Sequence, residues 1–140
     1  MPQVYSAHIT AGFDQNTDKL AIEITAPSNT TIKIKKIRVS HGNGTGTITT
    51  DYYKTVKLVR ESAAGTGGTS YTPVKMNANS VDSTATVKTG PFTVGTITDT
   101  VNILSVHSGT DFLWSAADEN DKIVVSPGGI FGIVVNPAAP

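Results

Sequence analysis

The sequence contains no cysteine and has no excess of charge of either sign. Without cysteine there are no disulfide bonds, no thiolate ligands for zinc or iron–sulfur clusters and no thiol nucleophile, so packing and strand pairing must supply the stability. Lys plus Arg and Asp plus Glu number 11 each, which gives a formal net charge of zero. Binding to nucleic acid needs a basic surface that neutralises phosphates, so direct contact with DNA or RNA is not expected.

Long apolar runs are also missing. No stretch approaches the roughly 18 apolar residues of a membrane-spanning helix, and residues 1–6 hold no basic segment followed by an apolar run. We therefore expect a soluble protein that is made in a cytoplasm and contacts no membrane. A chain of 140 residues has the length of one domain with one core, so residues 1–140 are predicted to form a single β-sandwich domain, with residues 1–17 as a candidate N-terminal arm.

Threonine is the commonest residue, and valine, glycine, serine and isoleucine are plentiful, whereas leucine, glutamate and methionine are scarce. Such a composition favours strands and turns, because β-branched side chains suit a pleated surface. Apolar residues fall at every second position in three runs: Leu20-Ile22-Ile24, Ile32-Ile34 and Ile37-Val39. Each run predicts a strand with one apolar face. Because the parity changes between Ile34 and Ile37, we predict a β-bulge or a change of sheet at Lys35-Lys36.

The rest of the chain continues this strand-and-turn pattern. Further strands are predicted over residues 47–61, 71–76, 84–88, 98–106, 111–115, 122–125 and 130–136, with a break at Gly90-Pro91 and a helical turn only at residues 115–119. The final strand is apolar on both faces, which predicts a central or inter-subunit position. With no helical periodicity and no internal repeat, the sequence indicates an all-β fold. We expect a single-domain, jelly-roll-like β-sandwich of about eight antiparallel strands.

Two polar loops rich in glycine interrupt the strands, at residues 41–46 and 63–70. Binding residues concentrate on loops held by a rigid scaffold, so His41 and Asn43 in the first loop and Thr66 and Ser70 in the second are candidate partner contacts. The alternating glycines at residues 42–46 precede a strand-like segment and not a helix, and no P-loop lysine follows, so they do not indicate a phosphate site.

Phe112 and Trp114 are the remaining candidate partner contacts. They share one face of a predicted strand, because two positions separate them. Three interpretations stay open: that they belong to the core, that they form a protein-contact hot spot, and that they stack against a sugar. Large aromatic side chains are more often buried than presented, which favours the core.

No catalytic or metal-binding signature stands out. His8, His41 and His107 are far apart in the sequence, and no Gly-x-Ser-x-Gly nucleophile motif occurs. The acidic residues 118–121 lack the spacing of an EF-hand, so a solvated turn is favoured there over a Ca²⁺ site. We expect no enzymatic activity and no cofactor. A small jelly-roll enzyme would require the three histidines or several acidic residues to converge in the fold.

Residues 56–77, running on to residues 85–89, resemble a pattern found in small structural proteins of tailed bacteriophages. A hydrophobic strand ends in Arg60, a loop of Gly, Ala and Thr follows, and then come a Thr-Pro-Val-Lys strand at residues 72–75, a polar loop and an Ala-Thr-Val strand at residues 85–87. The segment 127–137 also resembles the end of these proteins, and together the matching stretches cover a little over half of the chain.

This resemblance implies a capsid decoration or cement protein with a jelly-roll fold. Such a protein has no catalytic role, lies on the outside of the virion, binds the major capsid protein and stabilises the shell, often as an oligomer, for which a trimer is our expectation. The alternative is a carbohydrate-binding β-sandwich module, free or displayed on a virion, that stacks sugars on Trp114, Phe112 or the tyrosines.

Overall fold

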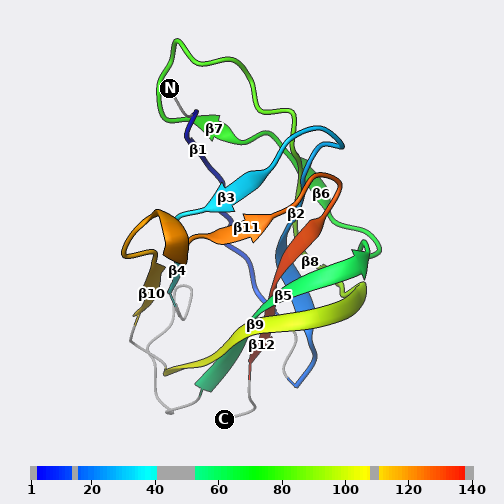
Figure 1. Ribbon diagram of the computed structural model, residues 1–140. Helices are drawn as coiled ribbons and strands as arrows, with labels where there is room; N and C mark the ends of the chain where they lie inside the picture. The colour runs from blue at the N-terminus through cyan, green and yellow to red at the C-terminus, as the bar shows by residue number, and fades with distance from the viewer. Residues whose placement is uncertain (1–2, 14–15, 41–52, 108–110, 138–140) are drawn as a thin grey trace.

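The computed structural model describes residues 3–13, 16–40, 53–107 and 111–137 (Figure 1). In these ranges the chain forms strands, short connections and one 3-10 turn, and no α-helix. The elements are β1 (Tyr5–Ser6), β2 (Lys19–Thr25), β3 (Ile32–Ile34), β4 (Lys36–Ser40), β5 (Tyr53–Ala63), β6 (Thr69–Tyr71), β7 (Val74–Lys75), β8 (Thr86–Thr93), β9 (Thr96–His107), β10 (Asp111–Ser115), η1 (Glu119–Asp121), β11 (Ile123–Val125) and β12 (Ile130–Pro137). The expected all-β class is confirmed. No helix in these ranges has the length and hydropathy needed to cross a membrane.

The largest layer is an antiparallel six-stranded sheet with the order β6-β8-β2-β12-β5-β9. Strand β12 lies at its centre, where Ile133 pairs with Ile22 of β2 and with Leu58 of β5. This placement confirms the central position predicted from the two apolar faces of the final strand. A strand that is buried on both faces needs apolar residues at successive positions, as β12 has.

The opposite layer is a narrow ribbon in which β3 pairs with β11 and β4 pairs with β10. Together with the pairs β2–β12 and β5–β9, these pairs are nested along the chain, from the outermost to the innermost. Two antiparallel stretches of chain therefore run side by side. The pair β2–β12 lies in the large sheet, the pairs β3–β11 and β4–β10 form the ribbon, and the pair β5–β9 lies in the large sheet again (Figure 1). This nesting is that of the predicted jelly-roll-like sandwich.

The break between β3 and β4 falls at Lys35, next to the predicted change of parity. The two strands belong to different two-stranded sheets, which confirms the predicted change of sheet. Ile34 and Ile37 are nevertheless both buried in the same apolar cluster. The interruption thus allows two runs of opposite parity to present their side chains to one core.

The main core lies between the large sheet and the ribbon. The sheet contributes Val56, Leu58 and Phe131, and the ribbon contributes Ile37 and Ile123. A second, smaller cluster lies on the other face of the sheet and consists of Leu20, Val59, Phe92 and Val134, with Val94 packed against it. The large sheet is therefore buried on both faces near β12.

One prediction about strand β2 is wrong. Leu20 was expected on the same face as Ile22 and Ile24, but Leu20 packs in the second cluster while Ile24 packs against the main core. The pairing with β12 slips at this point, because Ile22 pairs with Ile133 and Leu20 pairs with Val134. Ala21 is the extra residue of a β-bulge, and an extra residue reverses the side of the strand on which the following side chains lie.

Two other boundaries also differ from the sequence prediction. Gly90-Pro91 was expected to end a strand, yet β8 continues through it to Thr93. The helical turn expected at residues 115–119 forms slightly later, as η1, and the Asp118 side chain accepts a hydrogen bond from the Asn120 backbone N–H at 2.8 Å. That hydrogen bond caps the turn. The start of the strand predicted at residue 47 lies outside the described residues.

Replacing Phe131 by alanine should test the position of the core. The Phe131 side chain is fully buried in the main cluster, so its truncation leaves a cavity and should lower the free energy of unfolding by about 3 to 5 kcal/mol. Urea denaturation of the purified variant measures this loss. The matched control is Val124→Ala on β11, whose side chain is partly exposed and whose loss should cost less than about 1 kcal/mol. Equal losses in the two variants would contradict the core described above.

Candidate functional site

The segment that was predicted as a loose loop at residues 63–70 is exposed but anchored. Thr66 forms two backbone hydrogen bonds with Thr93, at 3.0 and 3.2 Å, and Ser70 belongs to edge strand β6, where it pairs with Lys88. Both candidate contacts, Thr66 and Ser70, are exposed. His41 and Asn43, the candidates from the other predicted loop, lie outside the described residues.

Trp114 is half-buried on β10 and packs against the main core. It pairs with Ile37 across the ribbon, while the neighbouring Leu113 projects outward and is largely exposed. Of the three interpretations left open, the packing of Trp114 favours the core. The side chain of Phe112, its predicted partner on the same face, lies outside the described part of the structure.

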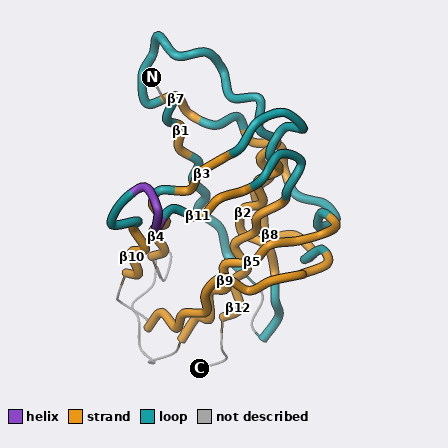
Figure 2. Tube along the Cα trace, in the orientation of Figure 1, coloured by secondary structure: helices purple, strands orange, loops and turns teal. Residues whose placement is uncertain are grey.

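Four exposed apolar side chains, including the two most exposed ones in the described residues, belong to a small lobe, here defined as residues 3–6 and 74–82, which projects from the sandwich (Figures 1 and 2). Strands β1 and β7 pair within it, and the loop after β7 forms its outer part. The exposed fractions are 49% for Val4, 47% for Val74, 65% for Met76 and 67% for Val81. Four such side chains close together form the kind of apolar surface that marks binding sites.

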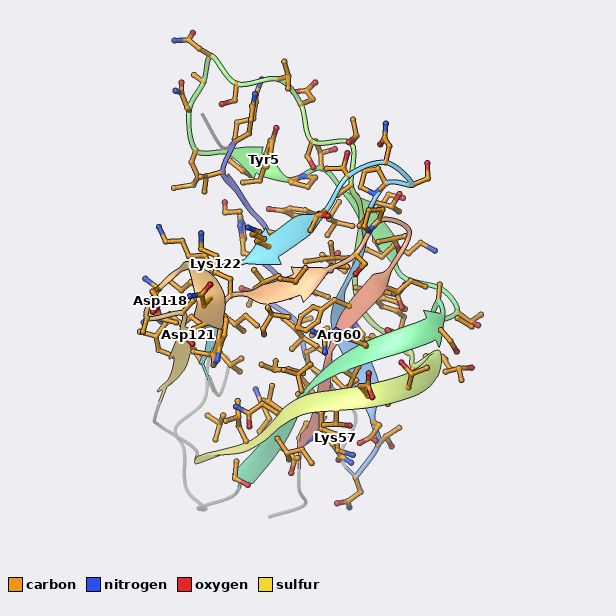
Figure 3. All side chains as sticks on the ribbon, viewed as in Figure 1. Tyr5, Lys57, Arg60, Asp118, Asp121 and Lys122 are labelled. Atoms are coloured by element: carbon orange, nitrogen blue, oxygen red, sulfur yellow. The ribbon has the colours of Figure 1, made fainter. Side chains whose placement is uncertain are left out.

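Polar contacts hold the lobe in shape. The Tyr5 hydroxyl donates to the Val81 carbonyl at 2.7 Å, and the Val81 N–H donates to Oε1 of Gln3 at 3.2 Å; Figure 3 labels Tyr5 in the lobe. The Met76 N–H donates to the Val4 carbonyl at 2.9 Å. These bonds join the N-terminal segment to the loop after β7, so the apolar side chains are presented on a fixed backbone.

The sequence pattern did not indicate this lobe as a candidate site. The N-terminal segment was predicted only as an arm, and residues 77–80 were predicted as a polar separator between strands. A signal was present, because Val74, Met76 and Val81 are apolar residues that flank a polar loop. It was weak, because the pairing of β1 with β7 joins segments about 70 residues apart, and local periodicity does not report such pairing.

A second apolar region runs along β9, the edge strand of the large sheet. Ile97, Val101 and Ile103 are exposed there, and no strand among the described residues pairs with the outer edge of β9. An open edge offers backbone N–H and C=O groups to another chain. This strand is a further candidate surface for contact with protein.

Two carboxyl groups, those of Glu23 and Glu61, are buried on the face of the sheet that carries the smaller apolar cluster. Their exposed fractions are 2% and 6%. Oε2 of Glu23 accepts a hydrogen bond from the Gly65 N–H at 2.8 Å, and Oε2 of Glu61 accepts one from the Gly95 N–H at 2.9 Å. Each carboxyl group thus holds a connection that crosses the sheet, one after β5 and the other between β8 and β9.

Burial, and to a smaller extent the neighbouring Glu23 carboxyl, raise the pKa of Glu61 to about 7. The hydrogen bond from Gly95 acts in the opposite direction, because it favours the charged form. Glu61 is therefore protonated in a large fraction of molecules at neutral pH.

The other polar side chains do not form a reactive group of residues in the described part of the chain. His8 lies against Tyr71, with the Tyr71 hydroxyl 3.1 Å from its Nδ1. Asp118 and Asp121 lie together at the capped turn η1 (Figure 3). Nowhere in the described ranges do three or more His, Asp or Glu side chains gather as metal ligands would. The side chains of His41 and His107 lie outside the described residues.

Comparison with protein-family models, with curated proteins and with solved structures finds no match to this chain. The resemblance to bacteriophage structural proteins therefore depends on the sequence segments quoted above.

Replacing Gly95 by alanine should test the crossing above the carboxyl pair. A Cβ atom at Gly95 would overlap the Ala63 carbonyl and lie 2.5 Å from Oε2 of Glu61, so the turn must move away from the sheet. We expect a loss of about 2 to 3 kcal/mol in the free energy of unfolding by urea. Gly12→Ala is the control, because a Cβ there meets no atom within 4 Å. If the two variants were equally stable, Gly95 would not be in close contact with Ala63 and Glu61.

Proposed function

We propose that this chain is a non-enzymatic virion structural protein that binds the outside of a phage capsid, where it contacts the major capsid protein and decorates or cements the shell. The resemblance of residues 56–77 and 85–89 to small phage structural proteins suggests the class. The observation that supports a binding role is the apolar lobe, which places Val4, Val74, Met76 and Val81 in solvent.

The lobe is suited to contact with another protein for two physical reasons. Burying apolar surface contributes roughly 25 cal/mol per Å², and Met76 and Val81 are mostly exposed in the free chain, so a partner gains from covering them. The hydrogen bonds of Tyr5 and of the Met76 N–H fix the lobe before binding, which reduces the loss of conformational entropy on association.

A cement role also requires that many weak contacts act together. A shell offers the same binding surface repeatedly, and an oligomer that engages several copies binds more tightly than a single chain. A ligand that binds only the assembled shell stabilises that shell by mass action. A trimer would place three lobes on one assembly, and the open edge of β9 supplies a separate surface for contact between chains.

The carbohydrate-binding alternative, which depends on stacking sugars against exposed aromatic rings, has less support from Trp114. Trp114 packs against the main core and is only partly accessible. Phe112, the second residue of that alternative, has its side chain outside the described residues.

The function should be tested on the particles themselves. Mass spectrometry of purified virions of the phage that encodes the chain should detect the protein, and purified protein should cosediment with heads that lack it and raise their temperature of disruption. Light scattering after size exclusion should give the mass of a closed oligomer. Absence of the chain from virions together with no binding to heads would contradict the proposal.

Substitutions in the lobe should separate binding from folding. The double variant Met76→Ser, Val81→Ser removes two exposed apolar side chains, so its Kd for heads should rise by about tenfold or more, with little change in urea stability. The control is Leu113→Ser, which removes another largely exposed apolar side chain, from β10 and away from the lobe. If both variants bound heads as tightly as the unaltered chain, the lobe would not be the contact surface.

A further inference from the structure

The buried carboxyl groups of Glu23 and Glu61 lie on adjacent parts of one sheet face. Glu23 pairs with Gly132 of β12, and a Cβ on Gly132 would lie 2.6 Å from Oε1 of Glu61, so the Glu61 side chain extends over the glycine toward Glu23. The nearby Glu23 carboxyl is one of the groups that raise the pKa of Glu61. The missing side chain of Gly132 provides the space in which the two acids meet.

The hydrogen bonds of this pair are incomplete while both groups are ionised. Each Oε2 atom accepts a backbone N–H, but Oε1 of Glu61 is buried and has no partner. An ionised carboxylate can only accept, so two of them cannot bond to each other. One added proton changes this, because the protonated group donates to the other and satisfies the unpaired oxygen.

The surroundings offer little positive charge to balance two carboxylates. Lys88 of β8 is in register with Glu23, but no ion pair joins either acid to a cation in the described ranges. Lys57, on the same strand as Glu61, binds Asp18 at 3.3 Å instead. The neighbours from β9 and β12 are the uncharged Ile97 and Gly132, and the connections at residues 64–68 and 94–95 carry no ionisable side chain. Two unbalanced charges in such a site are costly, so a shared proton is favoured.

We propose that Glu23 and Glu61 share a single proton and act as a pH-sensitive clasp that holds residues 64–68 and 94–95 against the sheet. Loss of the proton leaves two facing carboxylates, whose repulsion pushes at least one of them toward water. The displaced carboxylate gives up its backbone N–H, so the connection that it held opens. The clasp would operate whether or not the chain binds a capsid.

Opening of the clasp would change what the protein presents to solvent. Residues 64–68 cover Leu20 and Phe92 of the smaller cluster, since a Cβ at Gly65 would touch the Leu20 side chain at 2.6 Å and one at Gly68 would lie 3.1 Å from the Phe92 ring. Thr66, a candidate partner contact, lies on the same segment. A rise in pH would thus loosen this candidate contact and expose part of the second core, while the main core on the other face stays closed.

The direction of the pH dependence follows from proton binding. Between the ordinary pKa of 4.5 and the raised value of about 7, the folded chain holds a proton that the unfolded chain has released. The folded state is therefore favoured at the lower pH, and the free energy of unfolding should fall as the pH rises through this range. Above about pH 7, Glu61 should cause no further change in the free energy of unfolding.

The variant Glu61→Gln carries a permanent hydrogen-bond donor in place of the shared proton. Urea denaturation at pH 5 and at pH 8 gives the factor by which the unfolding equilibrium constant rises between the two. This factor should be at least about tenfold larger for the unaltered chain than for Glu61→Gln. Asp99→Asn, which removes an exposed acid from β9, should keep the pH dependence of the unaltered chain. Apart from the replaced residue, the three proteins carry the same ionisable groups, so the comparison isolates Glu61.

Two further measurements on the unaltered protein make the test independent of how well the variant folds. The ¹³C signal of the Glu61 carboxyl should titrate near neutral pH. Hydrogen-exchange protection of the Gly65 and Gly95 amides, corrected for intrinsic exchange, should fall from pH 5.5 to pH 8, while that of the Phe131 amide stays nearly constant. Titration of Glu61 near pH 4.5, or protection at Gly65 and Gly95 that does not depend on pH, would overturn the clasp.

Discussion

The pairing of β12 with β2 on one side and β5 on the other is the interaction on which the rest of this structure depends. These three strands connect the two edges of the large sheet, and their side chains contribute to both apolar clusters. Phe131 points into the main core and Val134 into the smaller one. Because both faces of β12 must be dry, each face needs its own cover, which the ribbon provides on one side and two chain connections provide on the other.

The cover on the second side explains why acidic residues are buried in a domain of this size. The connections at residues 64–68 and 94–95 contain backbone N–H groups that would be unsatisfied against an apolar sheet, and the carboxyl groups of Glu23 and Glu61 accept two of them. The same burial that makes these acids useful as acceptors makes their double ionisation costly. Stability of this face is therefore linked to pH, whereas the main core contains only apolar groups.

The surfaces proposed for binding lie where the sandwich is incomplete. The lobe extends beyond the two layers with its apolar side chains exposed, and the outer edge of β9 has no pairing strand among the described residues. Neither surface is needed to bury the cores, so each is free to meet a partner without unfolding the domain. A structural protein that binds a shell at several points needs such surfaces on a rigid frame.

The sequence by itself determined the strand composition, the all-β class, the change of sheet at Lys35 and the central place of the final strand, because alternation of apolar residues and β-branched side chains act locally. It did not determine the bulge at Ala21, which a regular alternation conceals and only the pairing with β12 shows. The tertiary structure alone brought β1 to β7 and Glu23 to Glu61. These contacts join residues far apart in the chain. Their free energy depends on burial and on the partners that the fold supplies, and a local sequence pattern contains neither.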